Sequence, residues 1–211
     1  MIACVDVDYR DDGARAACVL FRSWPDGDSA GERVVHVEAV EPYQPGQFYR
    51  RELPCLLAVL GPVAEGLEAV VIDGYVWLRD ESAPGLGGHL YEALGRAVPV
   101  VGVAKTRFRS AEVARPVLRG GSGRPLYVTA AGVSADEAAR HVRAMHGPYR
   151  IPTLLKRVDQ LCRGGVTALS AFTWATRLEH PARRYSKYST ATSLPSISRR
   201  RAPSSATSNS E

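Results

Sequence analysis

Cys4-Val5-Asp6-Val7-Asp8-Tyr9 predicts a first β-strand, in which the acid Asp6 stands inside an otherwise apolar run. Two more strand-like runs follow at residues 14–22 and 33–40, and the cluster Pro25-Asp26-Gly27 separates them. Such clusters mark tight turns, because Pro and Gly favour the backbone angles that turns need. The beginning of the chain therefore predicts a three-stranded antiparallel meander.

Helical and strand-like patterns alternate after this meander. Leu53, Leu56, Leu57 and Leu60 have the spacing of one face of a helix, although Pro54 leaves the start of that helix open. The later segments are a strand at 67–73, a helix at 86–94, a strand at 98–104, a hairpin of 113–119 and 124–130 around Gly120-Gly121-Ser122-Gly123, and a helix after the Ser134 capping box. This order predicts a mixed α/β sheet with flanking helices. It is typical of a ribonuclease H-like domain and compatible with other α/β folds.

Residues 163–211 differ in composition from the rest of the chain. The net charge of +5 divides into +6 on these residues (eight Lys and Arg against two acids) and −1 on residues 1–162 (19 against 20). The segment is rich in Ser, Thr and Arg and has too little apolar surface to offset the entropy lost on ordering. We expect a folded domain at 1–162 and a disordered basic tail at 163–211. A basic arm that follows a phosphate backbone is the alternative.

The composition also limits where the protein works. The chain has 45% hydrophobic and 23% charged residues, which is the balance of a globular protein. No apolar run approaches the roughly 18 to 20 residues that span a bilayer, and the N-terminus lacks the pattern of a secretory signal. The four cysteines have no metal-ligand spacing and are expected as buried thiols. We therefore expect a cytoplasmic monomer that does not bind membranes.

Three acids stand at unusual places in this layout. Asp6 lies inside the first strand, Asp73 closes the strand before Gly74, and Glu52 lies near the start of the helix between them. A carboxylate in such a position lowers the free energy of unfolding by roughly several kcal/mol unless it is paired or bound to a metal. Converging carboxylates are typical Mg²⁺ ligands. An arginine partner for Asp6, or a simple turn at Asp73-Gly74, would explain these acids without a metal.

Several motifs form a set with a fixed order and spacing. They are Pro42-Tyr43-Gln44-Pro45-Gly46-Gln47-Phe48-Tyr49-Arg50-Arg51-Glu52, Val71-Ile72-Asp73-Gly74, Pro99-Val100-Val101-Gly102-Val103-Ala104-Lys105, Pro125-Leu126-Tyr127-Val128, Val133-Ser134 and Tyr149-Arg150-Ile151-Pro152. This set resembles the endonuclease V family, the deoxyinosine-directed nucleases of DNA repair. The resemblance covers about residues 2–162, and the intervals between Asp6, Glu52 and Asp73 agree with those of the catalytic acids of the family.

The resemblance implies a ribonuclease H-like fold and a site for Mg²⁺, with Mn²⁺ as a substitute. Asp6, Glu52 and Asp73 would be the metal ligands, and Lys105 would be the active-site lysine that neutralises phosphate charge. The implied reaction is hydrolysis of the second phosphodiester 3′ to a deoxyinosine. The implied partner is DNA with deoxyinosine, and some members of the family act on inosine in RNA.

Four further residues match positions that handle the damaged base. Tyr43 would be a wedge that enters the duplex, and Gly46 and Gly74 would let the backbone approach the extruded base. Phe48 stands where members of the family often have Leu. An aromatic wedge suits this work, because base flipping costs a few kcal/mol, to an order of magnitude, and stacking offsets part of that cost.

The sequence also departs from the family. It has Asp73-Gly74-Tyr75-Val76 where the family usually has Asp-Gly-His-Gly, and a later family His falls within Ala130-Ala131-Gly132. His89 and Asp136 are candidates to approach the site in its place. Two alternatives therefore stay open: a catalytically impaired relic that binds inosine-containing nucleic acid, and a related nuclease for RNA or for mismatched or branched DNA.

Overall fold

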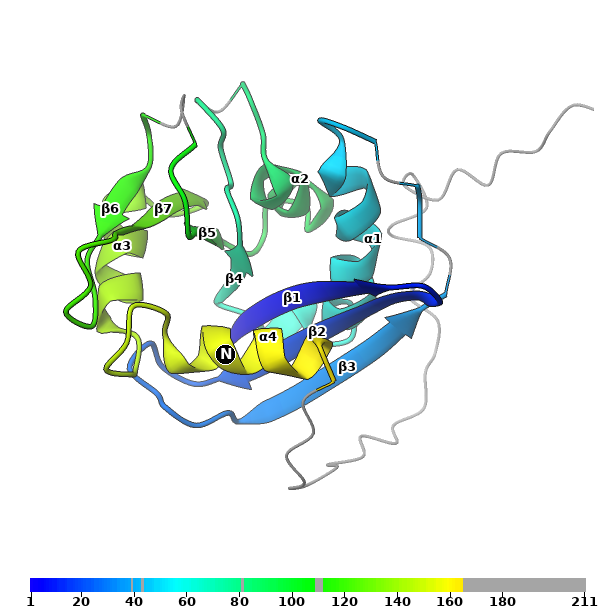
Figure 1. The fold of residues 1–211 in the computed structure, drawn as a ribbon, viewed down its shortest axis with the longest axis horizontal. Coiled ribbons are helices and arrows are strands. Elements are labelled where there is room, and N and C mark those ends of the chain that lie inside the picture. The colour runs from blue at the N-terminus through cyan, green and yellow to red at the C-terminus, as the bar shows by residue number, and fades with distance from the viewer. Residues whose placement is uncertain (39, 43, 81, 109–111, 165–211) are drawn as a thin grey trace, which may run out of the picture. The chain divides into compact units, whose positions relative to one another are not determined.

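A seven-stranded mixed sheet forms the centre of the fold (Figure 1). The computed structural model describes residues 1–38, 40–42, 44–80, 82–108 and 112–164. The strands are β1 (Ile2–Arg10), β2 (Gly13–Phe21), β3 (Gly31–Val37), β4 (Ala69–Asp73), β5 (Val100–Ala104), β6 (Arg115–Val117) and β7 (Leu126–Ala131). The helices are α1 (Phe48–Leu60), α2 (Leu86–Ala93), α3 (Ala135–Ala144) and α4 (Thr153–Cys162), with a 3₁₀ turn at Ala64–Gly66. All but the first two residues of the predicted tail lie outside the described residues.

The strand order is β3-β2-β1-β4-β5-β7-β6. Strands β1, β2 and β3 pair antiparallel, which confirms the predicted meander. Strands β4 and β5 run parallel to β1, whereas β7 and β6 continue the sheet antiparallel. The pairing of β1 with β4 ends at Val5 opposite Ile72, so Asp6 is the first residue of β1 beyond that pairing.

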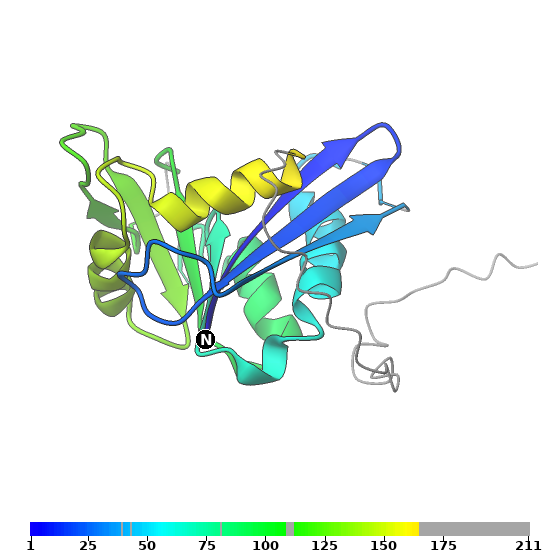
Figure 2. The same ribbon diagram turned by 90° about the horizontal axis from the view of Figure 1, so that it is seen from below.

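Helices cover both faces of this sheet. Figure 2 shows α4 on one face, with α1 and α2 on the other. Side chains alternate between the faces of a strand. Ile2 and Cys4 of β1 therefore pack into the core under α3 and α4, while Ala3 and Val5 pack into the core over α1 and α2. The same alternation directs Asp6 toward the α4 face.

Two other sequence predictions can be compared directly with the structure. All four cysteines are buried and free, as expected. Helix α3 begins after Ser134, whose hydroxyl accepts a hydrogen bond from the backbone N–H of Glu137 at 3.2 Å, which confirms the predicted cap. Within the described part of the chain, no helix has the length and apolar character that crossing a membrane requires.

Gly102 of β5 lies directly against the turn that follows β4. A Cβ atom at Gly102 would lie 2.6 Å from the carbonyl oxygen of Gly74 and 2.9 Å from the backbone nitrogen of Val76. That nitrogen donates a hydrogen bond of 2.8 Å to Oγ1 of the buried Thr129 on β7. Three neighbouring strands thus fix the turn after Asp73, and backbone atoms there cannot move aside for a side chain.

Gly102→Ala is expected to lower the free energy of unfolding by about 1–3 kcal/mol, because overpacking against backbone forces the strand ends apart. Gly31→Ala is the matched control, since a Cβ there meets its nearest atom at an ordinary 3.7 Å. Its effect should stay within about 0.5 kcal/mol. Urea denaturation measures both values, and equal stability of the two variants would contradict the close packing at Gly102.

Candidate active site

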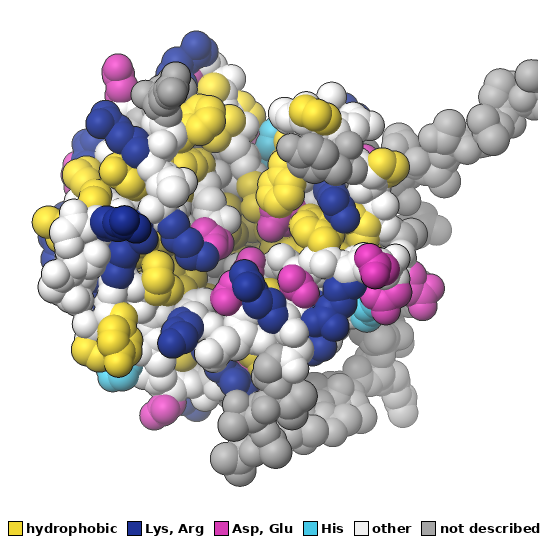
Figure 3. Space-filling view, in the orientation of Figure 1, with side chains coloured by type: hydrophobic (Ala, Val, Ile, Leu, Met, Phe, Trp, Pro, Cys, Tyr) yellow, Lys and Arg dark blue, Asp and Glu magenta, His cyan; other side chains and the backbone are white. Residues whose placement is uncertain are grey.

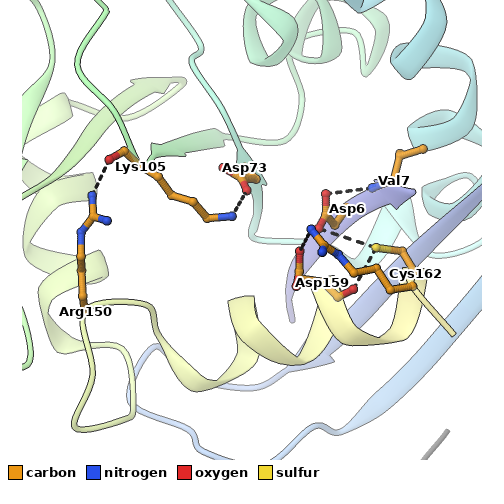
Figure 4. A network of polar contacts seen from close by, with 8 residues as sticks. Asp6, Val7, Asp73, Lys105, Arg150, Asp159 and Cys162 are labelled. Atoms are coloured by element: carbon orange, nitrogen blue, oxygen red, sulfur yellow. Dashed lines mark hydrogen bonds and ion pairs between the residues drawn. The ribbon is translucent and has the colours of Figure 1, made fainter. Parts of the chain in front are cut away.

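Asp6, Asp73 and Lys105 come from three neighbouring parallel strands. Asp73 is the last residue of β4, Lys105 follows the last residue of β5, and Asp6 stands where β1 leaves its pairing with β4. The carboxyl ends of parallel strands lie at one edge of a sheet, and ligands of open α/β sheets gather there. The fold therefore brings together three of the predicted site residues from distant parts of the sequence (Figure 4).

Asp6 is a half-buried acid among other negative charges. Its Oδ1 accepts a hydrogen bond of 2.9 Å from the backbone N–H of Val7, and the Cys162 thiol lies 3.7 Å from its Oδ2. Burial, followed by the charges of Asp73 and Asp159, raises the pKa of Asp6 to about 6, although the Val7 hydrogen bond and Lys105 oppose this. Negative charge at this position is only partly compensated by the protein.

Glu52 reaches the same charges from helix α1. Helix α1 begins at Phe48 and continues through Pro54, so Glu52 lies in its second turn and is only 7% exposed. Its Oε2 is buried and has no hydrogen-bond partner among the described residues. Burial, and then the charges of Asp6 and Asp73, raise the pKa of Glu52 to about 8. A buried carboxylate without a partner is costly, and a bound cation would relieve that cost.

Lys105 pairs with one of the acids. Its Nζ lies 2.5 Å from Oδ2 of Asp73. Burial lowers the pKa of Lys105, but the hydrogen bond and charge of Asp73, together with Asp159 and Asp6, outweigh burial and raise that pKa overall. The guanidinium of Arg150 donates to the carbonyl oxygen of Lys105 (Figure 4) and, at 2.9 Å, to that of Pro125. The lysine is thus a permanent cation on a fixed backbone.

Asp159 is an acid at this site that the sequence analysis missed. It lies on α4, its charge raises the pKa of Asp6, and it lines the same pocket. No helix was predicted here, although Pro152 precedes apolar residues at helical spacing, namely Leu154, Leu155, Val158 and Cys162, all buried. That spacing is the signal that identifies α4, with Asp159 beside the buried Val158.

The predicted base-handling residues are only partly described. Tyr43 lies outside the described residues. Gly46 and Gly74 have φ angles of +77° and +143°, and open space surrounds the position of a Cβ atom at each. Only glycine adopts such angles readily. Phe48, the first residue of α1, is 46% exposed, and its ring centroid lies 6.2 Å from that of Tyr9.

The two candidate replacements for the family histidine have other contacts. Oδ1 of Asp136 lies 2.6 Å from Nε of Arg115 in a surface ion pair. His89 stacks on Tyr49 with ring centroids 3.6 Å apart. Ala130 and Ala131, where the histidine motif aligns, are buried in β7. Asp159, whose Oδ1 lies 3.0 Å from a guanidinium nitrogen of Arg163, is the further acid whose charge acts on Asp6.

A pocket of about 530 Å³ adjoins the acids on the α4 face. We call it the α4 pocket; Asp6, Asp73, Lys105 and Asp159 line one end, and Ser122, Tyr149 and Lys156 line the rest together with apolar side chains. Acidic and basic side chains lie close together around the centre of this face (Figure 3). Among the described residues, no three His, Cys, Asp or Glu side chains already form a compact set of metal ligands.

Comparisons with known proteins place the chain in a family. The endonuclease V family model matches residues 1–127. The endonuclease V of Streptomyces avermitilis is 32% identical over 192 residues, which cover 79% of this chain and 81% of that relative. The chain belongs to the endonuclease V family. It is a hydrolase of the endonuclease V type, and the resemblance seen in its motifs is confirmed.

Solved structures confirm the ribonuclease H-like fold. A crystal structure of the Streptomyces avermitilis endonuclease V is similar with a TM-score of 0.64 and 31% identity, covering 77% of this chain and 79% of that chain. The Ciona intestinalis endonuclease V was solved with a 23mer DNA containing an inosine followed by a ribo-adenosine. It has a TM-score of 0.64 at 20% identity, covering 77% of this chain and 83% of that chain.

A further relative matches by sequence over a shorter range. An endonuclease V of Thermococcus kodakarensis is 36% identical over 108 residues, and this alignment spans about half of each chain (51% and 52%).

Tyr75 replaces a usual histidine of endonuclease V and anchors the loop after β5. Its hydroxyl donates a hydrogen bond of 2.8 Å to the carbonyl oxygen of Thr106 and accepts one of 2.9 Å from the backbone N–H of Phe108. The rings of Tyr75 and Phe108 lie 6.1 Å apart. This loop begins at Lys105, so the substitution holds the backbone that follows the lysine.

Tyr75→Phe is expected to release this loop, because the hydroxyl makes both hydrogen bonds. Hydrogen–deuterium exchange should become faster at the amide of Phe108 and stay unchanged in α3. Tyr91→Phe is the control, because it removes a hydroxyl that lies against Gly132. Unchanged exchange at Phe108 in Tyr75→Phe would contradict the anchoring role.

Proposed function

We propose that the protein is a metal-dependent endonuclease of DNA repair that hydrolyses the second phosphodiester 3′ to a deoxyinosine. The observation that carries this proposal is the convergence of Asp6, Glu52 and Asp73 with Lys105 in a chain of the endonuclease V family. The inosine-containing DNA in the Ciona relative supports the choice of substrate. We further propose that residues 1–162 form the nuclease domain, since α4, the last described helix, ends at Cys162.

The acids fit a divalent cation with oxygen ligands. Asp6, Glu52 and Asp73 would hold Mg²⁺, or Mn²⁺ as a substitute, with Asp159 beside them. The unpartnered Oε2 of Glu52 and the raised pKa values of Asp6 and Glu52 indicate that the protein itself stabilises the ionised forms of these buried acids too little, which a bound cation would correct. When bound, such a cation neutralises charge on the phosphate and polarises it for attack by water.

Lys105 would bind the phosphate next to these acids. Its raised pKa keeps the ammonium group charged at neutral pH, and Arg150 holds its backbone. In the structure, this ammonium group is paired with Asp73. The arrival of a phosphate gives Lys105 a second anion to bind, which frees an oxygen of Asp73. A fixed cation beside the scissile phosphate stabilises the charge that develops during hydrolysis.

The base-handling residues would act on the α1 side of the acids. Gly46, Phe48 and Gly74 would surround an extruded hypoxanthine, and Tyr43 would fill the gap in the duplex. The open space at Gly46 and Gly74 supports this assignment, because a side chain there would project into the space needed by the base.

Cleavage of an end-labelled oligonucleotide with one deoxyinosine tests the reaction. We expect a cut at the second phosphodiester 3′ to deoxyinosine that requires Mg²⁺ or Mn²⁺. Asp73→Ala should reduce its rate by about 10²–10³-fold, the cost of losing one group that stabilises the transition state. Asp136→Asn is the control and should cut normally, because Asp136 pairs with Arg115 away from the acids. Binding without cleavage under either metal would instead support a catalytically impaired relic. Equal cleavage of strands with and without inosine would support a related nuclease with another substrate.

Thermal unfolding tests the metal site without any substrate. Saturating Mg²⁺ or Mn²⁺ should stabilise the wild-type chain, by about 2.7 kcal/mol at a concentration of 100 Kd. Glu52→Gln should abolish this gain, and it should also raise the stability of the metal-free protein, because it replaces a buried, unpartnered carboxylate by a neutral group. Asp136→Asn should keep the wild-type response to metal. An equal metal response of Glu52→Gln and wild type would remove Glu52 from the site.

A further inference from the structure

The α4 pocket extends from the acids to an exposed aromatic and a basic side chain. Its apolar lining includes Val103, Leu126, Leu155 and Val158, and Tyr149 and Lys156 line it together with Asp6. A volume of about 530 Å³ is within the range of pockets that bind small molecules. The pocket is therefore large enough for a nucleoside and is continuous with the site of hydrolysis.

Tyr149 is held in place although its side chain is exposed. The side chain is 68% exposed, yet its backbone is fixed by Arg119, a guanidinium that is only 7% exposed. Arg119 donates hydrogen bonds to the carbonyl oxygens of five residues, namely Arg143, Met145, Gly147, Tyr149 and Arg150. Gly120 packs against the same loop, where a Cβ atom would lie 2.4 Å from the carbonyl carbon of Tyr149. Burial of the charged Arg119 is costly, and its hydrogen bonds hold the loop of Tyr149 in one conformation. We infer that this conformation serves a function.

The charges along the pocket suit a nucleic-acid strand. Asp6, Asp73 and Asp159 line the pocket, and the cations Lys156 and Arg150 line it as well. Neither cation has an ion pair with an acid in the described part of the chain, and Nε of Arg150 is buried without a partner. The ammonium group of Lys156 lies 6.0 Å from the ring centroid of Tyr149. Arg150 is engaged with the carbonyl oxygens of Lys105 and Pro125, so Lys156 is the cation available for a phosphate. An aromatic beside such a cation is an arrangement that binds single nucleotides by stacking and phosphate contact.

We propose that the α4 pocket binds the nucleotide directly 3′ of the scissile phosphodiester, with its base stacked on Tyr149 and its 3′-phosphate near Lys156. This inference rests on the proposed function, which places the deoxyinosine on the α1 side of the acids. Helices α1 and α4 cover opposite faces of the sheet (Figure 2). A strand that passes from one side to the other crosses the acids and Lys105, so the nucleotide beyond the cut lies at α4.

Two inosine-containing oligonucleotides test this assignment. They are identical except that one has an abasic analogue directly 3′ of the scissile bond. Binding is measured by fluorescence anisotropy in EDTA, and cleavage in Mg²⁺ gives KM and kcat. Wild type should bind the abasic strand at least about fivefold more weakly, with the loss in KM rather than kcat, because stacking on an aromatic contributes to affinity. Tyr149→Ala should weaken binding of the intact strand by the same factor and show no further loss with the abasic strand. Tyr149→Phe should behave as wild type.

Lys156→Gln tests the phosphate contact separately. It should reduce the slope of log affinity against log salt by about one unit, since one fewer counterion is released. Arg140→Gln, which removes an exposed cation on α3, is the matched control and should leave the slope unchanged.

Several outcomes would overturn the inference. The first is that wild type binds the abasic strand as tightly as the intact strand. The second is that Tyr149→Ala still binds the abasic strand more weakly than the intact strand, by the same factor as wild type. A wild-type chain that cleaves deoxyinosine strands yet shows neither effect refutes the pocket assignment alone. A chain that shows the abasic effect in binding but cuts no strand refutes the proposed function alone.

Discussion

The mutual repulsion of Asp6, Glu52 and Asp73 in their ionised forms is the constraint on which the site depends. Glu52 is buried near Asp6 and Asp73, and its Oε2 has no hydrogen-bond partner among the described residues, which costs folding free energy. Lys105 relieves part of this charge at Asp73. The rest of the fold keeps the acids in place despite their repulsion, through the close packing of Gly102 against the turn after β4 and the cores on both sides of the sheet.

Two arginines fix the backbone between the acids and the surface of the protein. Arg150 binds the carbonyl oxygen of Lys105, and Arg119 binds the carbonyl oxygens of the loop that includes Tyr149 and Arg150. The chain thus connects the lysine, the loop and the α4 pocket through backbone carbonyls rather than through flexible side chains. Such connections position groups before a substrate arrives, which lowers the entropy lost on binding.

The sequence was sufficient to predict a mixed sheet that begins with an antiparallel meander, and to select three acids and one lysine as site residues, but it did not predict α4. Asp6, Glu52, Asp73 and Lys105 each stand within a motif that resembles endonuclease V, so their proximity could be expected. Asp159 belongs to α4, which follows Pro152 outside the predicted elements, and the position that matches the family histidine lies in the buried strand β7. The role of Tyr75 was also hidden, because its partners at Thr106 and Phe108 lie more than 30 residues later in the chain.

The sequence by itself determined the strands, the capped helix α3, the buried cysteines and the family, because periodicity, turn residues and motif spacing are local properties of a chain. The tertiary structure decided how the charges act on one another. The pKa of Glu52, the pairing of Lys105 with Asp73, and the α4 pocket between the sheet and α4 all depend on distances between residues far apart in sequence. Electrostatic energies and cavities are set by those distances and by burial, and neither can be obtained from the order of residues alone.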